Sequence, residues 1–287
     1  MAKKRYNFRM KICNFCPRHC RVDRKNESGF CGEKEEIRIA KVIDNFMWEE
    51  PCLTTKKGVV AIFFSGCNLK CSYCQNHEIS SGGVGEIYST ENFISLLKEK
   101  EKTADYFDFI TPSHFTSAIL KALEKYTPKV PIIWNSSAYE SVEELKKLDK
   151  YISIYLLDFK YADNNLGARL SHVKNYFEIA QKVVEFCAKK ADVFKGEYMQ
   201  SGLIIRHLVL PGEVKNSLAV LDFLKKNHSN RHLSLMSQFT PTLKSPIKRK
   251  LTALEYKIVA KHFLDNFEKG YLQDFDSASD AFIPKFN

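Results

Sequence analysis

The stretch VVAIFFSGCNLKCSYC, residues 59–74, joins a strand-like run to three closely spaced cysteines. The run at 59–65 is apolar up to its last residue, as expected for a strand that is covered on both faces. Cys67, Cys71 and Cys74 follow it with the spacing C-x3-C-x2-C. Ligand sites of parallel α/β folds form at the carboxyl ends of strands, so this loop is predicted to hold a site. A tetrahedral zinc ion here would need a fourth ligand from elsewhere in the chain.

Five more strand-like runs follow, separated by stretches with helical periodicity. Strands are predicted at 59–65, 107–111, 132–135, 152–159, 203–210 and 233–239, and helices at 90–100, 117–125, from 141, and at 176–190, 217–226 and 251–267. Alternating strands and helices imply an α/β fold with a parallel sheet and right-handed crossovers. Eight such units close a full barrel, so six predict a partial (β/α)6 barrel. We expect the barrel at 57–245 and a C-terminal helix and tail, 246–287, packing on it.

Residues 1–56 lack this periodicity and form a small cysteine-rich segment. Cys13, Cys16, Cys20 and Cys31 read C-x2-C-x3-C-x10-C, with turn residues such as Gly29 between them. Four thiolates complete a tetrahedral site without outside help, and either zinc or an auxiliary iron–sulfur cluster fits them. We therefore expect metal rather than an apolar core to hold this segment.

Composition bounds the class of protein. The 287 residues carry a net charge of +10 and are 44% hydrophobic, enough for a substantial core. The basic residues are dispersed over predicted helix faces, which favours a solvated surface over a nucleic-acid partner. No apolar run is long enough for a membrane span, and the basic N-terminus lacks the apolar region of a secretory signal. Nine cysteines without such a signal are typical of a reducing compartment, so a cytoplasmic location is expected.

Polar residues recur where the predicted strands end. They are Thr111, His114, Asn135, Ser137, Asp158, Lys160 and Arg206. Because a barrel gathers the carboxyl ends of its strands around one cavity, these residues are candidates for binding a cofactor or substrate. His114 has a second interpretation, in which it only bonds to the backbone. Of the remaining cysteines, Cys187 is interpreted as core; Cys52 is interpreted as structural, although it also has the option of facing the cavity.

The cysteine triplet, with the aromatic Tyr73 before its last member, resembles the signature of the radical S-adenosylmethionine (SAM) superfamily. That resemblance implies a [4Fe–4S] cluster on the three thiolates, with the fourth iron left open and chelated by the amino and carboxylate groups of SAM. It also implies a low-potential electron donor of the flavodoxin or ferredoxin type. The missing protein ligand is thus expected to be the cosubstrate.

Longer segments resemble the PflX-type group, which is related to pyruvate formate-lyase activating enzymes. These segments are FFSGCNLKCSYCQN, ITPSHF, WNSSAYE, IYLLDFKY, GLIIRHLVLPG and LSLMSQFTP, with CNFCPRHCRVDR at the N-terminus. The resemblance implies that Asp158, Lys160 and Arg206 contact SAM and that Tyr73 lies by the adenine. The chain departs from activating enzymes after the second strand, where TPSH at 111–114 replaces their Gly-Gly-Glu-Pro element.

We therefore expect a cytoplasmic radical SAM oxidoreductase that works without oxygen. It would cleave SAM reductively to a 5′-deoxyadenosyl radical, which abstracts a hydrogen from a substrate. One version is an activase that acts on a glycine of a partner protein. The alternatives are an enzyme that modifies a peptide, an RNA or a small molecule, and a non-enzymatic iron–sulfur electron carrier that binds no SAM.

Overall fold

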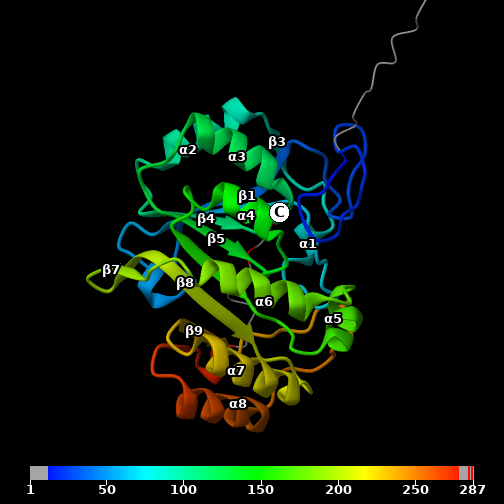
Figure 1. Ribbon diagram of the computed structural model, residues 1–287, viewed down its shortest axis with the longest axis vertical. Helices are drawn as coiled ribbons and strands as arrows, with labels where there is room; N and C mark the ends of the chain where they lie inside the picture. Colours follow the sequence, from blue (N-terminus) through cyan, green and yellow to red (C-terminus); the bar gives the residue numbers. More distant parts are fainter. Residues whose placement is uncertain (1–11, 278–283, 285, 287) are drawn as a thin grey trace, which may run out of the picture.

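A computed structural model describes residues 12–277, 284 and 286, and one curved sheet runs through it (Figure 1). The strand order is β10-β9-β8-β6-β5-β4-β2-β1-β3. Within the described residues, six neighbouring strands that the sequence predicts run parallel. They are β2 (Val59–Phe64), β4 (Tyr106–Ile110), β5 (Ile132–Ser136), β6 (Ile154–Asp158), β8 (Tyr198–Leu208) and β9 (His232–Met236). The predicted α/β class with a partial parallel barrel is confirmed.

Helices follow the strands, as the periodicity predicts. They are α2 (Thr90–Lys100), α3 (Thr116–Lys125), α4 (Val142–Leu148), α6 (Tyr176–Cys187), α7 (Val214–His228) and α8 (Ala253–Asn266). Helix α4 begins where the sequence predicts, because the Ser141 side chain accepts a hydrogen bond from the Glu144 amide. Helix α8 packs against α7, and Thr252 and Glu255 form a reciprocal capping box at its start.

Several further elements were not predicted. They are β1 (Ile37–Phe46), β3 (Glu86–Tyr88), β7 (Val193–Lys195), β10 (Gly270–Leu272), α1 (His77–Ser80), α5 (Asn164–Ser171) and the 3-10 turns η1 (Pro51–Leu53), η2 (Ser113–Phe115) and η3 (Phe275–Ser277). Strand β1 pairs antiparallel with both β2 and β3, and Ile37 and Ile39 are buried in the main core. Part of the predicted 1–56 segment therefore extends the sheet. The boundaries at 56 and 245 stay predictions, and residues 1–11 lie outside the described part of the chain.

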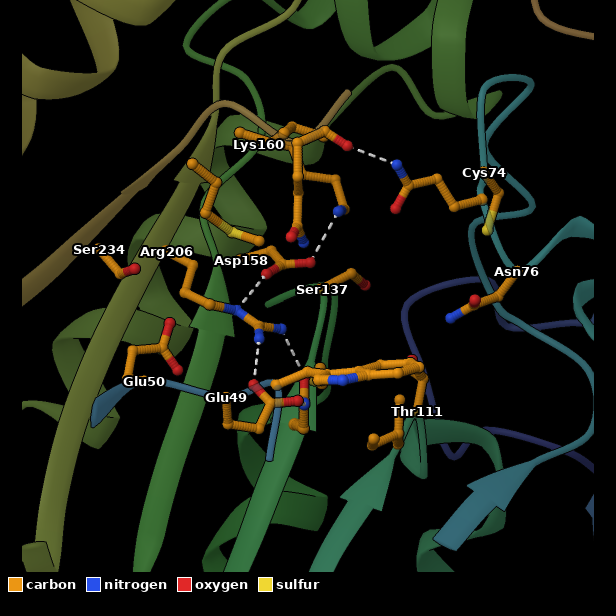
Figure 2. A pocket seen from close by; sticks show the side chains of 18 of the residues that line it. Glu49, Glu50, Cys74, Asn76, Thr111, Ser137, Asp158, Lys160, Arg206 and Ser234 are labelled. Atoms are coloured by element: carbon orange, nitrogen blue, oxygen red, sulfur yellow. Dashed lines mark hydrogen bonds and ion pairs between the residues drawn. The ribbon is translucent and has the colours of Figure 1, made fainter. Parts of the chain in front are cut away.

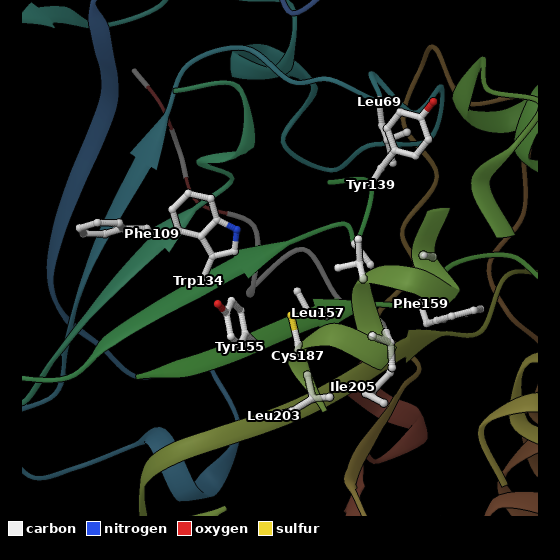
Figure 3. Close-up of a cluster of buried hydrophobic side chains, with 14 of the residues drawn as sticks. Leu69, Phe109, Trp134, Tyr139, Tyr155, Leu157, Phe159, Cys187, Leu203 and Ile205 are labelled. Atoms are coloured by element: carbon white, nitrogen blue, oxygen red, sulfur yellow. The ribbon is translucent and has the colours of Figure 1, made fainter. Parts of the chain in front are cut away.

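The alternation of side chains along each strand separates the core from the site. One set of positions, including Trp134, Tyr155 and Leu203, packs under the helices; Cys187 of α6 joins it, which confirms its core interpretation (Figure 3). The other set faces the concave inside of the sheet and is apolar in the lower part of the strands, as at Ile133 and Ile154.

Toward the carboxyl ends the inward positions turn polar. The register pairs Asp158 of β6 with Arg206 of β8, and Arg206 with Ser234 of β9. On β5 the inward position Asn135 pairs with Leu156, the inward position of β6 that precedes Asp158. The period of two thus directs polar side chains from four adjacent strands to one side of the sheet.

The described part of the C-terminal tail reaches the concave side, where the Phe286 ring lies 5.4 Å from that of Phe63. No helix in the described residues combines the length and the apolar composition needed to cross a bilayer.

Candidate functional site

The loop that carries the cysteine triplet leaves the carboxyl end of β2 through Gly66. Gly66 has φ +83°, and a Cβ on it would lie 2.6 Å from the Cys31 carbonyl oxygen. The next amide, on Cys67, donates to that same carbonyl at 3.3 Å. Only glycine allows both this backbone conformation and this close approach. The N-terminal segment is therefore docked directly against the cysteine loop.

The three sulfurs of the triplet lie close together and are partly surrounded by hydrogen-bond donors. The Leu69 amide donates to Cys67 Sγ at 3.3 Å, and the Ser171 hydroxyl donates to Cys71 Sγ at 2.9 Å. Burial, followed by the neighbouring thiols, raises the pKa of Cys74 to about 12. Thiols in such a place stay protonated until a metal displaces the protons. Donors aimed at sulfur are what an iron–sulfur cluster requires of its surroundings, so these residues fit that group.

A cavity of about 540 Å³ opens beside the triplet on the concave side of the sheet. Its volume lies in the range of small-molecule and cofactor sites. All three cysteines line it, together with most of the predicted cofactor-binding residues: Tyr73, Thr111, Asn135, Ser137, Asp158, Lys160 and Arg206. The structure therefore brings residues from the ends of four parallel strands to one hollow, although their roles toward a cofactor stay predictions.

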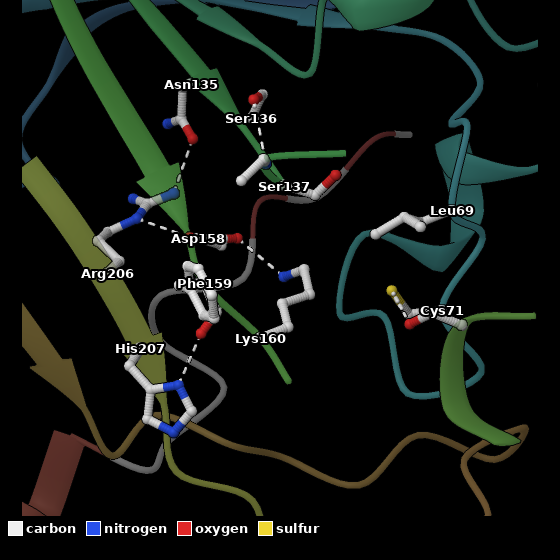
Figure 4. Close-up of polar contacts among 12 residues, drawn as sticks. Leu69, Cys71, Asn135, Ser136, Ser137, Asp158, Phe159, Lys160, Arg206 and His207 are labelled. Atoms are coloured by element: carbon white, nitrogen blue, oxygen red, sulfur yellow. Dashed lines mark hydrogen bonds and ion pairs between the residues drawn. The ribbon is translucent and has the colours of Figure 1, made fainter. Parts of the chain in front are cut away.

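Arg206 is the centre of the polar network in this cavity (Figures 2 and 4). Its Nε donates to Asp158 at 2.8 Å, one terminal nitrogen donates to Glu49 at 2.7 Å, and the other donates to the side-chain Oδ1 of Asn135 at 2.7 Å. The guanidinium is nearly buried, so these charge-assisted bonds are poorly screened by water.

Asp158 also pairs with Lys160, whose Nζ lies 2.8 Å from Oδ2. Burial raises the pKa of Asp158, but the charges of Arg206 and Lys160 outweigh it and lower the pKa to about 2. The Tyr176 hydroxyl fixes this segment, since it lies 2.7 Å from the Asp158 carbonyl oxygen and accepts from the Lys160 amide at 2.9 Å. Asp158 is therefore an ionised acceptor at neutral pH, held in place by the backbone.

His114 does not line the cavity. It is buried, and its Nε2 lies 2.6 Å from the Ser65 carbonyl oxygen, as in the alternative interpretation of its role. Burial lowers the pKa of His114 to about 3, so the ring is neutral and Nε2–H donates. Tyr73 does line the cavity, and its hydroxyl accepts from Tyr161 at 2.8 Å.

Sequence reasoning missed three acidic residues at the site. Glu49 and Glu50 belong to the loop between β1 and β2 and line the cavity. Asp108 is a fully buried inward position of β4 behind the lining, and it accepts from the Asn135 side-chain amide at 3.1 Å. The acidic pair between Trp48 and Pro51 was the available signal. It could not be used, because the loop meets Arg206 across 157 residues of sequence.

Glu50 makes the free protein sensitive to pH. Burial, followed by the Glu49 charge and opposed by Arg206, raises the pKa of Glu50 from 4.5 to about 7. Folded protein then binds more protons than unfolded protein between pH 4.5 and 7, so this group's contribution to stability falls as the pH rises through that window. We expect the free energy of unfolding of Glu50→Gln, measured with urea at pH 8, to exceed that of the wild type by up to about 3 kcal/mol. At pH 5 this difference in unfolding free energy should nearly vanish. A variant less stable than the wild type at pH 8 would contradict the expectation.

The N-terminal cysteines also lie near one another. A Cβ on Gly29 would be 3.5 Å from Cys31 Sγ and 3.6 Å from Cys20 Sγ, and Cys13 and Cys16 are buried beside them. In the described part of the chain, no three Cys, His, Asp or Glu side chains converge on a single metal ion. This is true of the barrel triplet and of the N-terminal cysteines alike. In both sets the thiols lie near one another without the spacing of ligands around a single ion.

Arg18 fastens the N-terminal segment to the cysteine loop. Its guanidinium donates to the carbonyl oxygens of Asn68 and His172 at 2.6 and 2.7 Å, and it lies 3.7 Å from the centre of the Phe30 ring. Planar, multiply donating contacts of this kind suit arginine better than lysine.

Cys52 lies outside the cavity lining. It is buried in η1 and contacts Tyr271 of β10. Burial raises the pKa of its thiol to about 11. This agrees with the structural interpretation of Cys52 rather than with a free thiol in the cavity.

The strand-end cavity beside the cysteine triplet defines an α/β protein with a candidate cluster site, and comparison with known proteins gives the family. The model "Radical SAM superfamily" matches residues 61–224. The chain belongs to this superfamily, and membership implies a [4Fe–4S] cluster, SAM and radical chemistry.

Two kinds of relative accompany this match. An uncharacterized protein of Methanocaldococcus jannaschii, MJ0674, is 33% identical over 256 residues, which cover 84% of this chain and 71% of that protein. Among solved structures, Streptococcus suis SuiB bound to precursor peptide SuiA aligns with a TM-score of 0.50 at 16% identity, over 72% of this chain and 46% of that one. SuiB alone aligns with a TM-score of 0.50 at 15% identity, over 75% and 48%. The chain thus spans about half of these structures, which share its fold.

Proposed function

We propose that this radical SAM enzyme belongs to the PflX-type group related to pyruvate formate-lyase activating enzymes. It cleaves SAM reductively and then removes a hydrogen atom from its substrate. The observation that carries the proposal is the position of the cysteine triplet: Cys67, Cys71 and Cys74 open onto the same cavity as the charged side chains Asp158, Lys160 and Arg206.

When bound, the reduced cluster supplies the electron that splits SAM into methionine and a 5′-deoxyadenosyl radical. The chain's own residues bind and orient SAM. Arg206 and Lys160 suit its carboxylate, whereas ionised Asp158 suits hydroxyl or ammonium donors. Burial lowers the pKa of Lys160, but Asp158 and the nearby Cys71 more than offset this, so the pKa is raised and the amine stays charged. The three groups keep complementary charges across the neutral range, and the low-dielectric cavity wall strengthens each contact.

The substrate side of the proposal has several versions. An activase would present the radical to a glycine of a partner protein; the alternatives are a peptide, an RNA or a small molecule. A flavodoxin or ferredoxin supplies the electron, and the cytoplasm is the proposed location. The electron-carrier alternative accounts for the cysteines but gives no reason for a charged cavity beside them, so an enzyme is favoured.

Reductive SAM cleavage tests the proposal. Anaerobically reconstituted protein, incubated with dithionite and SAM, is expected to form 5′-deoxyadenosine and methionine in equal amounts. A preparation with a full complement of cluster iron and sulfide that forms neither product would overturn it.

We further propose that the N-terminal cysteines hold an auxiliary iron–sulfur cluster. A structural zinc ion draws four thiolates to about 2.3 Å, whereas a cluster spaces its ligands around several iron and sulfide atoms. The four thiols are gathered around Gly29, an arrangement that can accommodate a cluster. The hydrogen bond from the Cys67 amide to the Cys31 carbonyl links the two cysteine sets and offers a short route for an electron.

Metal analysis of a variant with Cys67, Cys71 and Cys74 all replaced by alanine checks this. We expect iron with acid-labile sulfide to remain, and to be lost when Cys16 and Cys20 are replaced as well. Retention of zinc instead would assign a structural staple and contradict the cluster.

A further inference from the structure

The cavity has an acidic side whose carboxyl groups Glu49 and Glu50 are not among the proposed SAM contacts. In Figure 2, Glu50 and Ser234 lie on the side of the cavity opposite Cys74 and Asn76. Glu50 comes from the loop that follows β1, and Ser234 is an inward position of β9. This side therefore lies away from the loop that holds the cluster.

Carboxylates outnumber cations around this side. Glu49 and Asp158 both form ion pairs with Arg206, and Asp158 forms a second ion pair with Lys160. Each of these two carboxylates therefore has a cationic partner. Glu50 is different. Its Oε2 is buried, with no hydrogen-bond partner among the described residues, although the residue lines the cavity. A buried carboxylate oxygen without a partner is costly, and a cation entering the cavity would offset that cost.

Asp108 is a third carboxyl group beside Arg206. It is fully buried, one of its oxygens accepts from the Asn135 amide, and the other has no partner in the described part of the chain. Burial, followed by the Glu49 charge, raises the pKa of Asp108 well above its usual value, so this residue adds a carboxyl group rather than a full negative charge. Glu49, Glu50 and Asp108 thus lie around a single guanidinium, that of Arg206.

An aromatic ring completes the surroundings. Tyr271 of β10 lines the same cavity. Burial and the neighbouring Cys52 are the main causes that raise the pKa of the Tyr271 hydroxyl, and the Glu50 charge adds to them. Carboxylates beside an aromatic face form the usual environment for a protonated amine.

We propose that Glu50, assisted by Glu49 and the Tyr271 ring, binds an ammonium group of the substrate. The inference rests on the proposed function and names its substrate class: a molecule or peptide side chain with a primary amine. SAM itself carries an ammonium group. In this superfamily that group belongs at the open iron beside the triplet, on the other side of the cavity from Glu50, so the geometry points to the substrate.

Equilibrium dialysis under nitrogen tests the inference, with n-pentylamine as the probe and 1-pentanol as its uncharged control. The SAM-loaded holoenzyme is expected to bind the amine saturably and the alcohol at least tenfold more weakly. Glu50→Gln should weaken amine binding at least tenfold. Glu78→Gln, which removes an exposed carboxylate of α1, should leave it unchanged. Unfolding curves confirm that both variants are folded.

Each other outcome decides against the inference. Equal binding of amine and alcohol, or equal amine binding by wild type and Glu50→Gln, overturns the ammonium site. If Glu50→Gln weakens SAM binding as strongly as amine binding, the carboxylate serves the SAM ammonium, which also overturns it. The same wild-type preparation is assayed for 5′-deoxyadenosine: SAM cleavage without amine binding defeats this inference alone, whereas absent cleavage defeats the proposed function.

Discussion

Cys71→Ser is expected to abolish reductive SAM cleavage, a loss matched at this site only by substitution of Cys67 or Cys74. Cys71 is the middle member of the triplet, and its Sγ accepts a hydrogen bond from Ser171. A serine hydroxyl is too weakly acidic to replace a thiolate on iron, so the cluster loses one of three protein ligands. The measurement is 5′-deoxyadenosine formed per protein with dithionite and SAM.

Cys187→Ala is the matched control. Cys187 is a buried thiol of α6 in the core under the helices and does not line the cavity (Figure 3). This variant should cleave SAM within about twofold of the wild type, an effect below 1 kcal/mol. If Cys71→Ser retained full activity, or if both variants lost it equally, the triplet would not be the cluster site.

Arg206→Ala should have the second largest effect, on both stability and SAM binding. The substitution leaves Glu49 and Asp158 with one buried cation fewer, and breaking such a pair typically costs about 3–5 kcal/mol of unfolding free energy. Losing a charge-assisted contact to the SAM carboxylate, worth about 1.5–3 kcal/mol, should weaken SAM binding tenfold to hundredfold. Urea unfolding and equilibrium dialysis with SAM measure the two effects.

Two further variants separate these effects. Arg206→Lys keeps the charge, but its compact ammonium lacks the planar, spread-out donors with which the guanidinium reaches Asp158, Glu49 and Asn135 together. We therefore expect it to regain part of the stability and less of the SAM affinity. Arg249→Ala breaks a surface pair with Glu255 and should change neither the stability nor the SAM binding measurably. Wild-type SAM affinity in both Arg206 variants would remove Arg206 from the binding site.

The strands of the barrel could be predicted because each is buried on both faces. Runs such as VVAIFF in β2 and IYLLD in β6 are apolar or aromatic almost throughout, and their short length and their β-branched and aromatic residues distinguish them from buried helices. Strand β1 escaped prediction because it lies near the edge of the sheet, where its outer positions carry Arg38, Lys41 and Asp44. Charged residues on exposed strands protect such edges but hide the strand signal.

The residues of the site that lie at the carboxyl ends of strands could be predicted, whereas those on loops and turns could not. Asn135, Asp158 and Arg206 are inward positions of neighbouring strands, so one periodicity argument places all three. His114 was harder, because it lies in a 3-10 turn, where a shift of one residue redirects the side chain. Glu49 and Glu50 depend on how a loop crosses the concave face, and no local pattern encodes that contact.

Magnetic resonance of the reduced triplet cluster tests the central claim most directly. The protein carries Cys16→Ala and Cys20→Ala, which removes the signal of an N-terminal cluster, and it is reduced with dithionite. SAM is then added that is labelled with 15N in its amino group and with 17O in its carboxylate. The spectrum of the cluster is recorded before and after this addition. The account predicts that SAM changes the spectrum and that both labels couple to the cluster, because Cys67, Cys71 and Cys74 leave one iron open. A fully assembled cluster whose spectrum is unchanged by saturating SAM, with coupling to neither label, would contradict it.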